Sequence, residues 1–486
     1  MPDLPTTAAT LVRADEHRVP ELLAGSALDR AGGHIGLGDF WSWFTDMGLR
    51  SFVVVEPIPL TELSGWTGDF DTGNISHHTG KFFSIEGLDV QVPGGPVTGW
   101  SQPIINQPEI GILGILVKQF DGVLHCLMQA KVEPGNANGL QLSPTVQATR
   151  SNYTQVHKGK AVPYLDYFRD TSRHRVITDV RQSEQGSWFY HKRNRNMVVE
   201  VTEDVEVVDG FVWLTLGQLH ALLAVDDLVN MDARTVLSCL PFSGVGLVNT
   251  LGANGTGFQA ALVRSCGPEV SSVLGAGDVL SWITDVRSRA EVHTSVIPLR
   301  DVRHWHRTGH VIAHDSGRFF DVMAVRVRAE GREVQEWTQP MIKPIGEGVV
   351  AFLVSRIGGV LHVLVHALVQ PGCLDVAELA PTVQCAPENY AELPAEARPR
   401  FLDDVLAAPP ERIRYDVTLS EEGGRFYHAR NRYVIAEVEA GPAHEHPDFR
   451  WMTVHQLVEL LRHSHYVNVE ARSLLACLQS LSGGAS

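Results

Sequence analysis

The feature that most constrains the fold of this chain is an internal duplication with a single offset. The heptapeptide FYHKRNR at 189–195 returns as FYHARNR at 426–432, 237 residues later. The same offset relates GWSQP at 99–103 to EWTQP at 336–340, and LSPTVQATRSNY at 142–153 to LAPTVQCAPENY at 379–390. Because one offset serves segments spread through each half, the sequence predicts two copies of one domain and not a short-period solenoid.

The length and composition suit two such domains. The chain has 486 residues, of which 44% are hydrophobic and 20% are charged, as in globular proteins of ordinary composition. A segment rich in Gly and Ser lies between the two copies and favours a boundary there. We therefore expect a first repeat over 1–245, a linker over 246–275 and a second repeat over 276–486.

Each repeat combines strand and helix patterns. Apolar runs at 111–120 and 123–132 flank Asp121 and Gly122 and predict a hairpin, which returns around Gly358 and Gly359. Thr215 and its counterpart Thr453 precede apolar residues at helical spacing and are predicted to be N-caps. The sequence thus predicts an α+β domain used twice.

Charge and targeting signals exclude several classes of protein. The formal net charge of −16 argues against general nucleic-acid binding, which depends on Lys and Arg meeting phosphates. The N-terminal sequence has no cationic region followed by an apolar core, and no later run reaches the ~18 apolar residues of a membrane span. The six cysteines are scattered without a CxxC pair. We expect a cytoplasmic protein with reduced thiols and no membrane contact.

The repeated motif carries the first group of candidate binding residues. If the run after Tyr190 is extended, His191, Arg193 and Arg195 point to one face and Asn194 to the other. Two adjacent guanidiniums are suited to binding a diphosphate, because each can donate a planar fork of hydrogen bonds. The alternative is a salt-bridged sheet face with a structural role.

A second polar segment follows the predicted hairpin. Its alternating polar side chains predict a hydrogen-bonding wall, although a solvated sheet face is the alternative. The members are Gln129, Lys131, Glu133, Gln141, Ser143, Thr145 and Gln147, followed by Arg150, Asn152 and Tyr153. The second repeat keeps Gln384, Asn389 and Tyr390. It replaces the charged residues Lys131, Glu133 and Arg150 by Leu368, Gln370 and Pro387.

These two segments, QAKVEPGNANGLQLSPTVQATRSNYTQVH and SEQGSWFYHKRNRNMVVEV, strongly resemble the NDP-hexose 2,3-dehydratases of deoxysugar biosynthesis. The resemblance implies a homodimer whose subunit is a tandem duplication of a Nudix-like mixed-sheet domain with flanking helices. It also implies that the enzyme acts on dTDP-4-keto-6-deoxy-D-glucose without any organic redox cofactor and that a 3-ketoreductase takes its product. The spacing of His304, His306, His310 and His314 resembles that of metal ligands, but no acidic or Cys partner lies at a characteristic spacing, so we expect no metal site. The hydrolase signature of true Nudix enzymes, G-x5-E-x7-R-E-x2-E-E-x-G, does not occur in the chain.

Such a reaction needs a base near C3, donors to the C4 oxygen and an acid for the departing C2 hydroxyl. The titratable candidates are His191, Tyr153, Tyr190, Lys131 and Glu133. We expect Arg150, Arg193 and Arg195 to bind the diphosphate and oxyanion, with Asn152, Asn194 and the polar wall as further ligands. Trp100 or Trp188 is a candidate to stack on thymine, with a core position as the alternative.

The duplication also predicts a second pocket. Its expected residues are Gln384, Asn389, Tyr390, Tyr427, His428, Arg430, Asn431 and Arg432. Since this pocket lacks the charged wall, we expect the first repeat to carry the elimination. A nucleotide-sugar-binding protein that is non-catalytic or hydrolytic is the alternative function.

Overall fold

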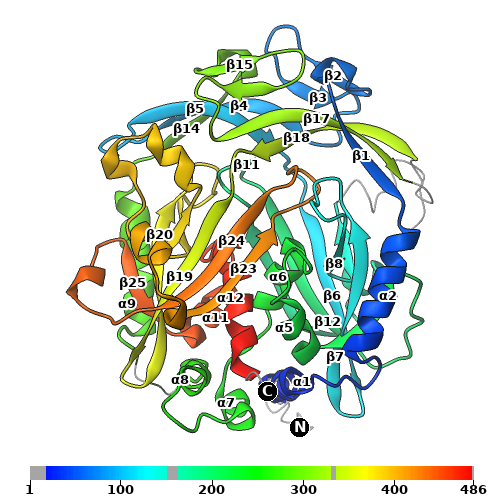
Figure 1. The fold of residues 1–486 in the computed structure, drawn as a ribbon, viewed down its shortest axis with the longest axis vertical. Coiled ribbons are helices and arrows are strands. Elements are labelled where there is room, and N and C mark those ends of the chain that lie inside the picture. The colour runs from blue at the N-terminus through cyan, green and yellow to red at the C-terminus, as the bar shows by residue number, and fades with distance from the viewer. Residues whose placement is uncertain (1–17, 150–161, 269, 271, 330–334, 484–486) are drawn as a thin grey trace, which may run out of the picture.

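Figure 1 shows the chain as a computed structural model, which describes residues 18–149, 162–268, 270, 272–329 and 335–483. Two sheets stand side by side in the lower part of the view, and two further sheets lie across their upper ends. Three predicted site residues, Arg150, Asn152 and Tyr153, lie outside the described residues.

The two lower sheets are copies of one another. The first contains β6 (Gly111–Phe120), β7 (Val123–Val132), β8 (Leu140–Ser143), β9 (Val146–Ala148), β10 (Arg175–Ser183), β12 (Arg193–Val201) and β13 (Phe211–Thr215). The second contains β19 (Gly348–Ile357), β20 (Val360–Val369), β21 (Ala377–Ala380), β22 (Val383–Cys385), β23 (Ile413–Ser420), β24 (Arg430–Glu437) and β25 (Phe449–Met452). Strand β12 is parallel to β6 and β24 is parallel to β19, while the other pairs within each lower sheet are antiparallel. The structure confirms a mixed α and β architecture built from two repeated domains.

The two upper sheets exchange a strand between the repeats. One sheet contains β2 (Trp66–Gly68), β3 (Ile75–His77), β4 (Ser84–Gln91), β5 (Gly99–Asn106) and β11 (Phe189–Tyr190), and adds β14 (His293–Ile297) from the second repeat. The other contains β15 (Trp305–Arg307), β16 (Ile312–His314), β17 (Phe320–Ala329) and β18 (Glu336–Pro344), and adds β1 (Val53–Ile58) from the first repeat. Strand β14 pairs with β4 and β1 pairs with β17, both antiparallel. Each repeat therefore completes the upper sheet of the other.

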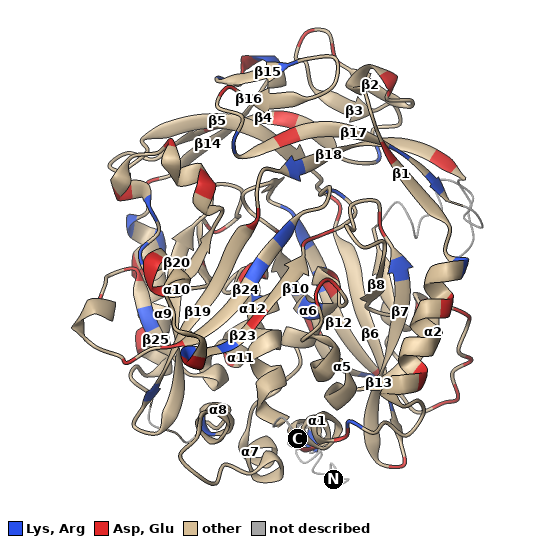
Figure 2. Cartoon of the chain, viewed as in Figure 1, with Lys and Arg blue, Asp and Glu red and all other residues tan. Residues whose placement is uncertain are grey.

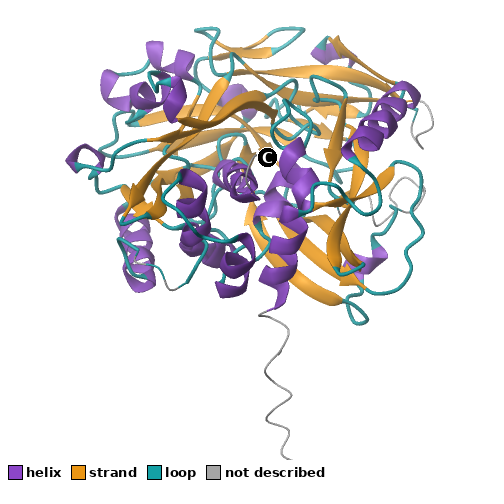
Figure 3. Ribbon diagram, turned by 60° about the horizontal axis from the view of Figure 1, so that its bottom comes forward, coloured by secondary structure: helices purple, strands orange, loops and turns teal. Residues whose placement is uncertain are grey.

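Helices lie between the lower sheets, below them and along their outer sides (Figure 1 and Figure 3). They are α1 (Arg18–Leu28), α2 (Leu37–Arg50), α4 (Asp166–Arg169), α5 (Leu216–Leu222), α6 (Met231–Ser238), α7 (Val245–Leu251), α8 (Phe258–Ser265), α9 (Ala276–Arg289), α10 (Leu402–Leu406), α11 (Val454–Leu461) and α12 (Val469–Ser480). The segment expected to join the repeats thus contains most of α7 and all of α8. Helix α7 lies against α1, and α8 lies against β20.

Several local predictions are confirmed. The predicted hairpin is formed by β6 and β7, and Asp121 and Gly122 take the positive φ values of 49° and 83° that a tight hairpin turn requires. Gly358 and Gly359 do the same in the second repeat, with φ values of 59° and 80°. Thr215 caps α5 and Thr453 caps α11, each accepting a hydrogen bond from the backbone of the Gln three residues later.

Two buried arginines join the repeats at the centre of the molecule. Arg234 on α6 donates to Ser473 Oγ at 2.5 Å, and Arg472 on α12 donates to Thr235 Oγ1 at 2.6 Å. Arg234 also donates to the carbonyl of Ser420, and Arg472 to the carbonyl of Ser183, so each guanidinium reaches the sheet of the other repeat. Both side chains are fully buried. Since one hydrophobic core also spans both repeats, the two domains form a single packed unit.

Candidate active site

The repeated FYH motif sits where the two repeats cross. Gly135 N donates to the carbonyl of Gly423, and His428 N donates to the carbonyl of Gly135. The symmetric pair of bonds runs from Gly372 N to Gly186 and from His191 N to Gly372. The turn after each hairpin is therefore held against the repeated motif of the other repeat.

This crossing explains why the motif is not one extended strand. His191 and His428 adopt left-handed backbone angles, with φ of 52° and 53°. The chain turns at each histidine, so β11 ends at Tyr190 and β12 begins at Arg193. The prediction that His191, Arg193 and Arg195 share one face of a continuous strand is therefore wrong. Each histidine ring instead stacks on the preceding tyrosine, with ring centroids 4.0 Å apart in both repeats.

One arginine of each repeated pair is engaged in a salt bridge. Arg195 holds Asp179 through two hydrogen bonds of 2.7 and 2.6 Å, and Arg432 holds Asp416 in the same way. Their partners lie on the neighbouring strands β10 and β23, two residues before the position directly opposite each arginine. For Arg195 and Arg432 the arrangement matches the salt-bridged sheet face that we considered as an alternative.

The other arginine of each pair differs between the repeats. Arg430 forms a 2.7 Å ion pair with Asp227 from the first repeat. The equivalent of Asp227 beside Arg193 is His465, so Arg193 has no carboxylate at that position. Among the described residues, neither Arg193 Nε nor Arg430 Nε has a hydrogen-bond partner, although both atoms are buried, so the difference lies in the ion pair with Asp227. Burial and the nearby Arg181 lower the pKa of Arg193, which is the environment expected where an anion is to bind.

A cavity of about 590 Å³ opens beside the lower sheet of the second repeat. We call it the second-half pocket, and residues from both repeats line it. Those from the first repeat include Trp100, Gln102, Gln185 and Trp188, and those from the second include Gln384, Asn389, Tyr390, Glu421, Arg430, Asn431 and Glu470. Five of the eight residues predicted for a second pocket thus meet in one cavity. Tyr427, His428 and Arg432 are not among its lining residues.

The cavity corrects the placement of the two tryptophans. Trp100 and Trp188 belong to the first repeat in sequence, but they line the second-half pocket. Trp188 packs edge-on against Phe426, and Trp100 donates to Gln102 Oε1 at 2.9 Å. Both indole side chains therefore lie at a pocket that is lined largely by residues of the second repeat.

The symmetric position in the first half holds a group of charged residues, which we call the first-half cluster. Its members are Lys131, Glu133, Glu184, Lys192, Asp232, Glu422 and Arg425, which interact electrostatically with one another. Around the second-half pocket the equivalent residues are Leu368, Gln370, Glu421, Ala429, Glu470, Gln185 and Trp188. The first-half cluster therefore has seven ionisable residues, whereas the equivalent set around the second-half pocket has two, Glu421 and Glu470. In Figure 2, Lys and Arg residues are coloured blue on the strands at the centre of the view.

Hydrogen bonds link the predicted wall to this cluster. Lys131 Nζ lies 3.4 Å from Glu133 Oε1, and Gln147 Nε2 donates to the same oxygen at 2.7 Å. Asn194 donates to Glu184 Oε1 at 2.7 Å. The structure therefore brings together the predicted residues Lys131, Glu133 and Gln147, and it pairs the predicted Asn194 with Glu184, which was not predicted.

Other members of the wall have structural roles. Thr145 Oγ1 donates to the carbonyl of Leu127 and accepts from the amide of Leu116, which ties β9 to the hairpin. Gln141 is fully buried and accepts from Ser420 Oγ across the repeats at 2.9 Å. Ser143 Oγ donates to the carbonyl of Gln129. The buried members of this wall bond to the protein itself, so the solvated face that we considered does not describe them.

Sequence reasoning did not find five members of the first-half cluster: Glu184, Lys192, Asp232, Glu422 and Arg425. Glu184 is 4% exposed, and burial raises its pKa. Burial also raises the pKa of Asp232 well above its usual range and that of Glu422 to about 7, and it lowers the pKa of Lys192 to about 8. The signal was present in the repeated motif, where SEQG at 183–186 aligns with SEEG at 420–423.

The candidate base His191 has a lowered pKa. Burial is the main cause, and the adjacent Arg193 adds to it. The imidazole is therefore largely neutral at physiological pH and able to accept a proton. Tyr190 stacks on this ring and packs against an apolar cluster of Leu88, Val90 and Ile104 in the upper sheet.

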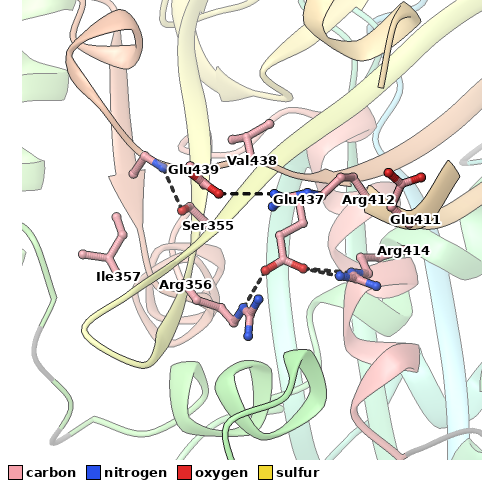
Figure 4. Close-up of a pocket in the computed structure, with 10 residues that line it drawn as sticks. Ser355, Arg356, Ile357, Glu411, Arg412, Arg414, Glu437, Val438 and Glu439 are labelled. Carbon is pink, nitrogen blue, oxygen red and sulfur yellow. Dashed lines mark hydrogen bonds and ion pairs between the residues drawn. The ribbon is translucent and has the colours of Figure 1, made fainter. Parts of the chain in front are cut away.

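A second cavity lies on the outer face of the second repeat and carries none of the motif residues (Figure 4). Arg356 and Arg414 both bond to Glu437, and Arg412 pairs with Glu439. The first repeat has a related pairing, in which Arg175 lies 3.3 Å from Glu200. These paired charges hold the outer sheet face together.

The residues that the structure describes contain neither a metal-binding cluster nor a membrane-spanning helix. No group of three or more His, Cys, Asp or Glu is placed to hold a metal ion among those residues. None of the helices found there is long and apolar enough to cross a bilayer. The six cysteines are unpaired thiols.

Comparison with known proteins assigns the family. The model of the NDP-hexose 2,3-dehydratase family matches twice, at residues 37–240 and 276–478. Proteins named dTDP-4-dehydro-6-deoxy-alpha-D-glucopyranose 2,3-dehydratase are similar over nearly the whole chain. The one from Saccharopolyspora spinosa is 54% identical over 94% of both chains, and the one from Amycolatopsis orientalis is 48% identical over 97% of both. A third, from Streptomyces violaceoruber, is 46% identical over 91% of this chain and 97% of its own. The chain therefore belongs to the NDP-hexose 2,3-dehydratase family, and it is a lyase.

Proposed function

We propose that the protein removes the C2 hydroxyl of dTDP-4-keto-6-deoxy-D-glucose and that this reaction takes place in the first half. The observation that carries the proposal is the first-half cluster, which gathers seven ionisable side chains at one of two symmetric positions. The names of the three relatives agree with this substrate.

The reaction needs the kind of groups that the cluster contains. A base removes the proton on C3, and the electron pair passes to the C4 carbonyl oxygen to give an enolate. The enolate then reforms the C4 carbonyl, a double bond forms between C2 and C3, and the C2 hydroxyl leaves as water after an acid protonates it. The resulting enol tautomerises to a 3,4-diketone. Proton transfers of this kind typically contribute ~10²- to 10⁴-fold each.

The positions of the charged residues suggest a division of roles. Arg193 is the cation without a carboxylate partner at the position that Asp227 takes beside Arg430, and we assign it to the diphosphate. Lys131, which lies beside Glu133, is suited to stabilise the developing negative charge on the C4 oxygen. The neutral His191 and the carboxylates Glu133 and Glu422 are candidate proton carriers.

Other expectations belong to the same proposal. The mixed sheets with flanking helices agree with a Nudix-like fold used for lyase chemistry, and we expect a cytoplasmic homodimer that needs no cofactor. The vicinal diketone is reactive, so we expect a 3-ketoreductase to consume it directly.

The test is incubation of the purified protein with dTDP-4-keto-6-deoxy-D-glucose in the presence of an aromatic 1,2-diamine. A vicinal diketone condenses with the diamine to a quinoxaline, which is measured by its absorbance and mass. Formation of the quinoxaline supports the dehydratase. Binding without a diketone would favour a non-catalytic nucleotide-sugar-binding protein, and release of free dTMP or dTDP would favour a hydrolase.

A further inference from the structure

We infer that Glu422, contributed by the second repeat, moves a proton in the elimination carried out at the first-half site, and that Glu184 of the first repeat sets its proton affinity. This inference rests on the proposed function, and it deepens that function by adding a catalytic residue and a positioning residue. It also makes the first-half site a product of both repeats.

The first support is the crossing of the chain. Gly135 N donates to the carbonyl of Gly423 at 2.7 Å, so the turn after Glu133 is fixed against the segment that follows Glu422. Gly423 lies so close to the wall that a Cβ atom at this position would be 3.0 Å from Glu133 Cβ and 2.2 Å from Asn136 Oδ1. A larger residue at position 423 would have to displace the Asn136 side chain, so the segment 422–425 packs closely against the first-half wall.

The second support is the pseudo-symmetry with the second-half pocket. Gln185 is the equivalent of Glu422, and it lines that pocket together with Glu421. Gln185 Nε2 donates to Glu421 Oε2 at 3.0 Å, which joins the two repeats across the pocket. In the first half the same two positions hold Glu422 and Glu184. The pair of an amide and a carboxylate in the second half thus corresponds to a pair of carboxylates in the first half, and these two interact electrostatically.

The third support is an unmet hydrogen-bonding group. Glu184 Oε1 accepts from Asn194, but Oε2 is buried and has no partner among the described residues. In the second repeat the corresponding oxygen of Glu421 is the one that accepts from Gln185. The geometry therefore aims Glu184 Oε2 toward Glu422, and a proton held between the two carboxyl groups would satisfy it.

The environment of Glu422 suits proton transfer near neutral pH. Its carboxylate accepts from the backbone amides of Gly424 and Arg425 at 3.0 and 2.7 Å, which fixes its orientation. Burial, with Glu133 and Glu184 nearby, raises its pKa to about 7, while Arg425 opposes the rise. Lys192 and Asp232 also lie within its electrostatic range. Two adjacent carboxyl groups cannot both ionise readily, so one keeps a proton.

The chemical step is balanced by this pair. Ionised Glu422 takes the proton from C3, the electron pair moves to the C4 oxygen, and the carboxyl group thus formed holds the proton. The second step releases the C2 hydroxyl as water with one proton, so the carboxyl group returns to its ionised form if it supplies that proton. No oxidant or reductant is needed.

The test uses Glu422→Gln, which places in the first-half site the residue that the second-half pocket carries naturally. We expect turnover to fall by about 100-fold or more, with the dissociation constant for dTDP changed by no more than about two-fold, because the charge removed is not a diphosphate ligand. Exchange of the C3 proton with deuterium from solvent should be lost with turnover. The matched control is Glu439→Gln on the outer face of the second repeat, where the carboxylate pairs with Arg412, and it should leave both rates unchanged.

Glu184 is tested by the pH profile. Glu184→Gln removes a negative charge beside Glu422 and should shift the acidic limb of the rate profile to lower pH while the rate at its plateau falls less than in Glu422→Gln. A folded Glu422→Gln enzyme with normal turnover and normal C3 exchange would overturn the inference. If the unmodified protein forms no diketone, the proposed function itself fails, so the two failures are distinguishable.

Discussion

Arg430 forms a 2.7 Å ion pair with Asp227, whereas the equivalent Arg193 faces His465 at the same place in the other half. The two repeats thus keep the same arginine but give it different partners. In the second repeat the charge is already neutralised, and in the first it is available to an anionic ligand.

We therefore expect Arg193→Ala to weaken binding of dTDP-sugar by about 1.5 to 3 kcal/mol, the contribution of a hydrogen bond to a charged group. Isothermal titration calorimetry on folded protein measures this effect. Arg195→Ala is the control, because its guanidinium is held by Asp179. Equal losses in both variants would contradict the assignment of Arg193 to the diphosphate.

The second prediction is that the repeats do not fold separately. A fragment of residues 1–245 lacks β14, Arg472 and half of the shared core, and it leaves the carbonyl of Ser183 without its donor. We expect this fragment alone to be protease-sensitive and to lack cooperative thermal unfolding. Co-expression with 246–486 should restore a resistant complex. A stable, cooperative fragment 1–245 would show that the exchange of strands is dispensable.

The third prediction concerns stability at acidic pH. His366 stacks on Phe449 with centroids 4.2 Å apart, and burial lowers its pKa to about 4. An unfolded histidine has a pKa of about 6.5. Between these two pKa values the unfolded chain binds a proton at His366 that the folded chain does not bind. The free energy of unfolding therefore falls as the pH drops from about 6.5 to about 4. At pH 5 this single group should cost on the order of 2 kcal/mol.

His366→Gln, which copies Gln129 of the first repeat, should remove this component. Urea unfolding at pH 7.5 and pH 5.0 gives the change for each protein. We expect the difference between the two pH values to be smaller in the variant. An identical drop in both proteins would mean that His366 is not buried in its neutral form.

The fourth prediction is that turnover survives exhaustive treatment with EDTA and needs no added nicotinamide. The reason is that Lys131, Arg193 and Arg425 already place positive charge around the site, as stabilisation of an enolate and a diphosphate requires. Activity is followed by trapping the diketone before and after chelation. Loss of turnover that zinc or magnesium restores would contradict this account.

Much of the local structure could be predicted from the sequence, because it depends on short-range patterns. The hairpin around Asp121 and Gly122 and the caps at Thr215 and Thr453 follow from turn and capping chemistry within a few residues. The polar wall was also visible, although which of its members bond to backbone was not.

The arrangement between the repeats could not be predicted in the same way. Neither the residues of β1 nor those of β14 indicate which upper sheet they will join, since either sheet offers an edge of similar pattern. The contacts between the repeats also place Trp100 and Trp188 at the second-half pocket and fix the segment after Glu422 against the first-half wall. The alignment of Gln185 with Glu422 could be read from the sequence. The position of Glu422 beside residues of the first repeat could not, because it depends on the contact between Gly135 and Gly423.

The most direct test of the account is a comparison of two variants that alter one half each. The first double variant, Lys131→Leu with Glu133→Gln, replaces two charged wall residues of the first half by the residue types found at the equivalent positions of the second half. The second double variant, Tyr390→Phe with Arg430→Ala, alters the second-half pocket. Steady-state diketone formation should fall by about 100-fold or more in the first variant and by no more than about three-fold in the second. Near-normal turnover in the first variant with a collapse in the second would show that the second-half pocket, and not the first-half cluster, carries the elimination.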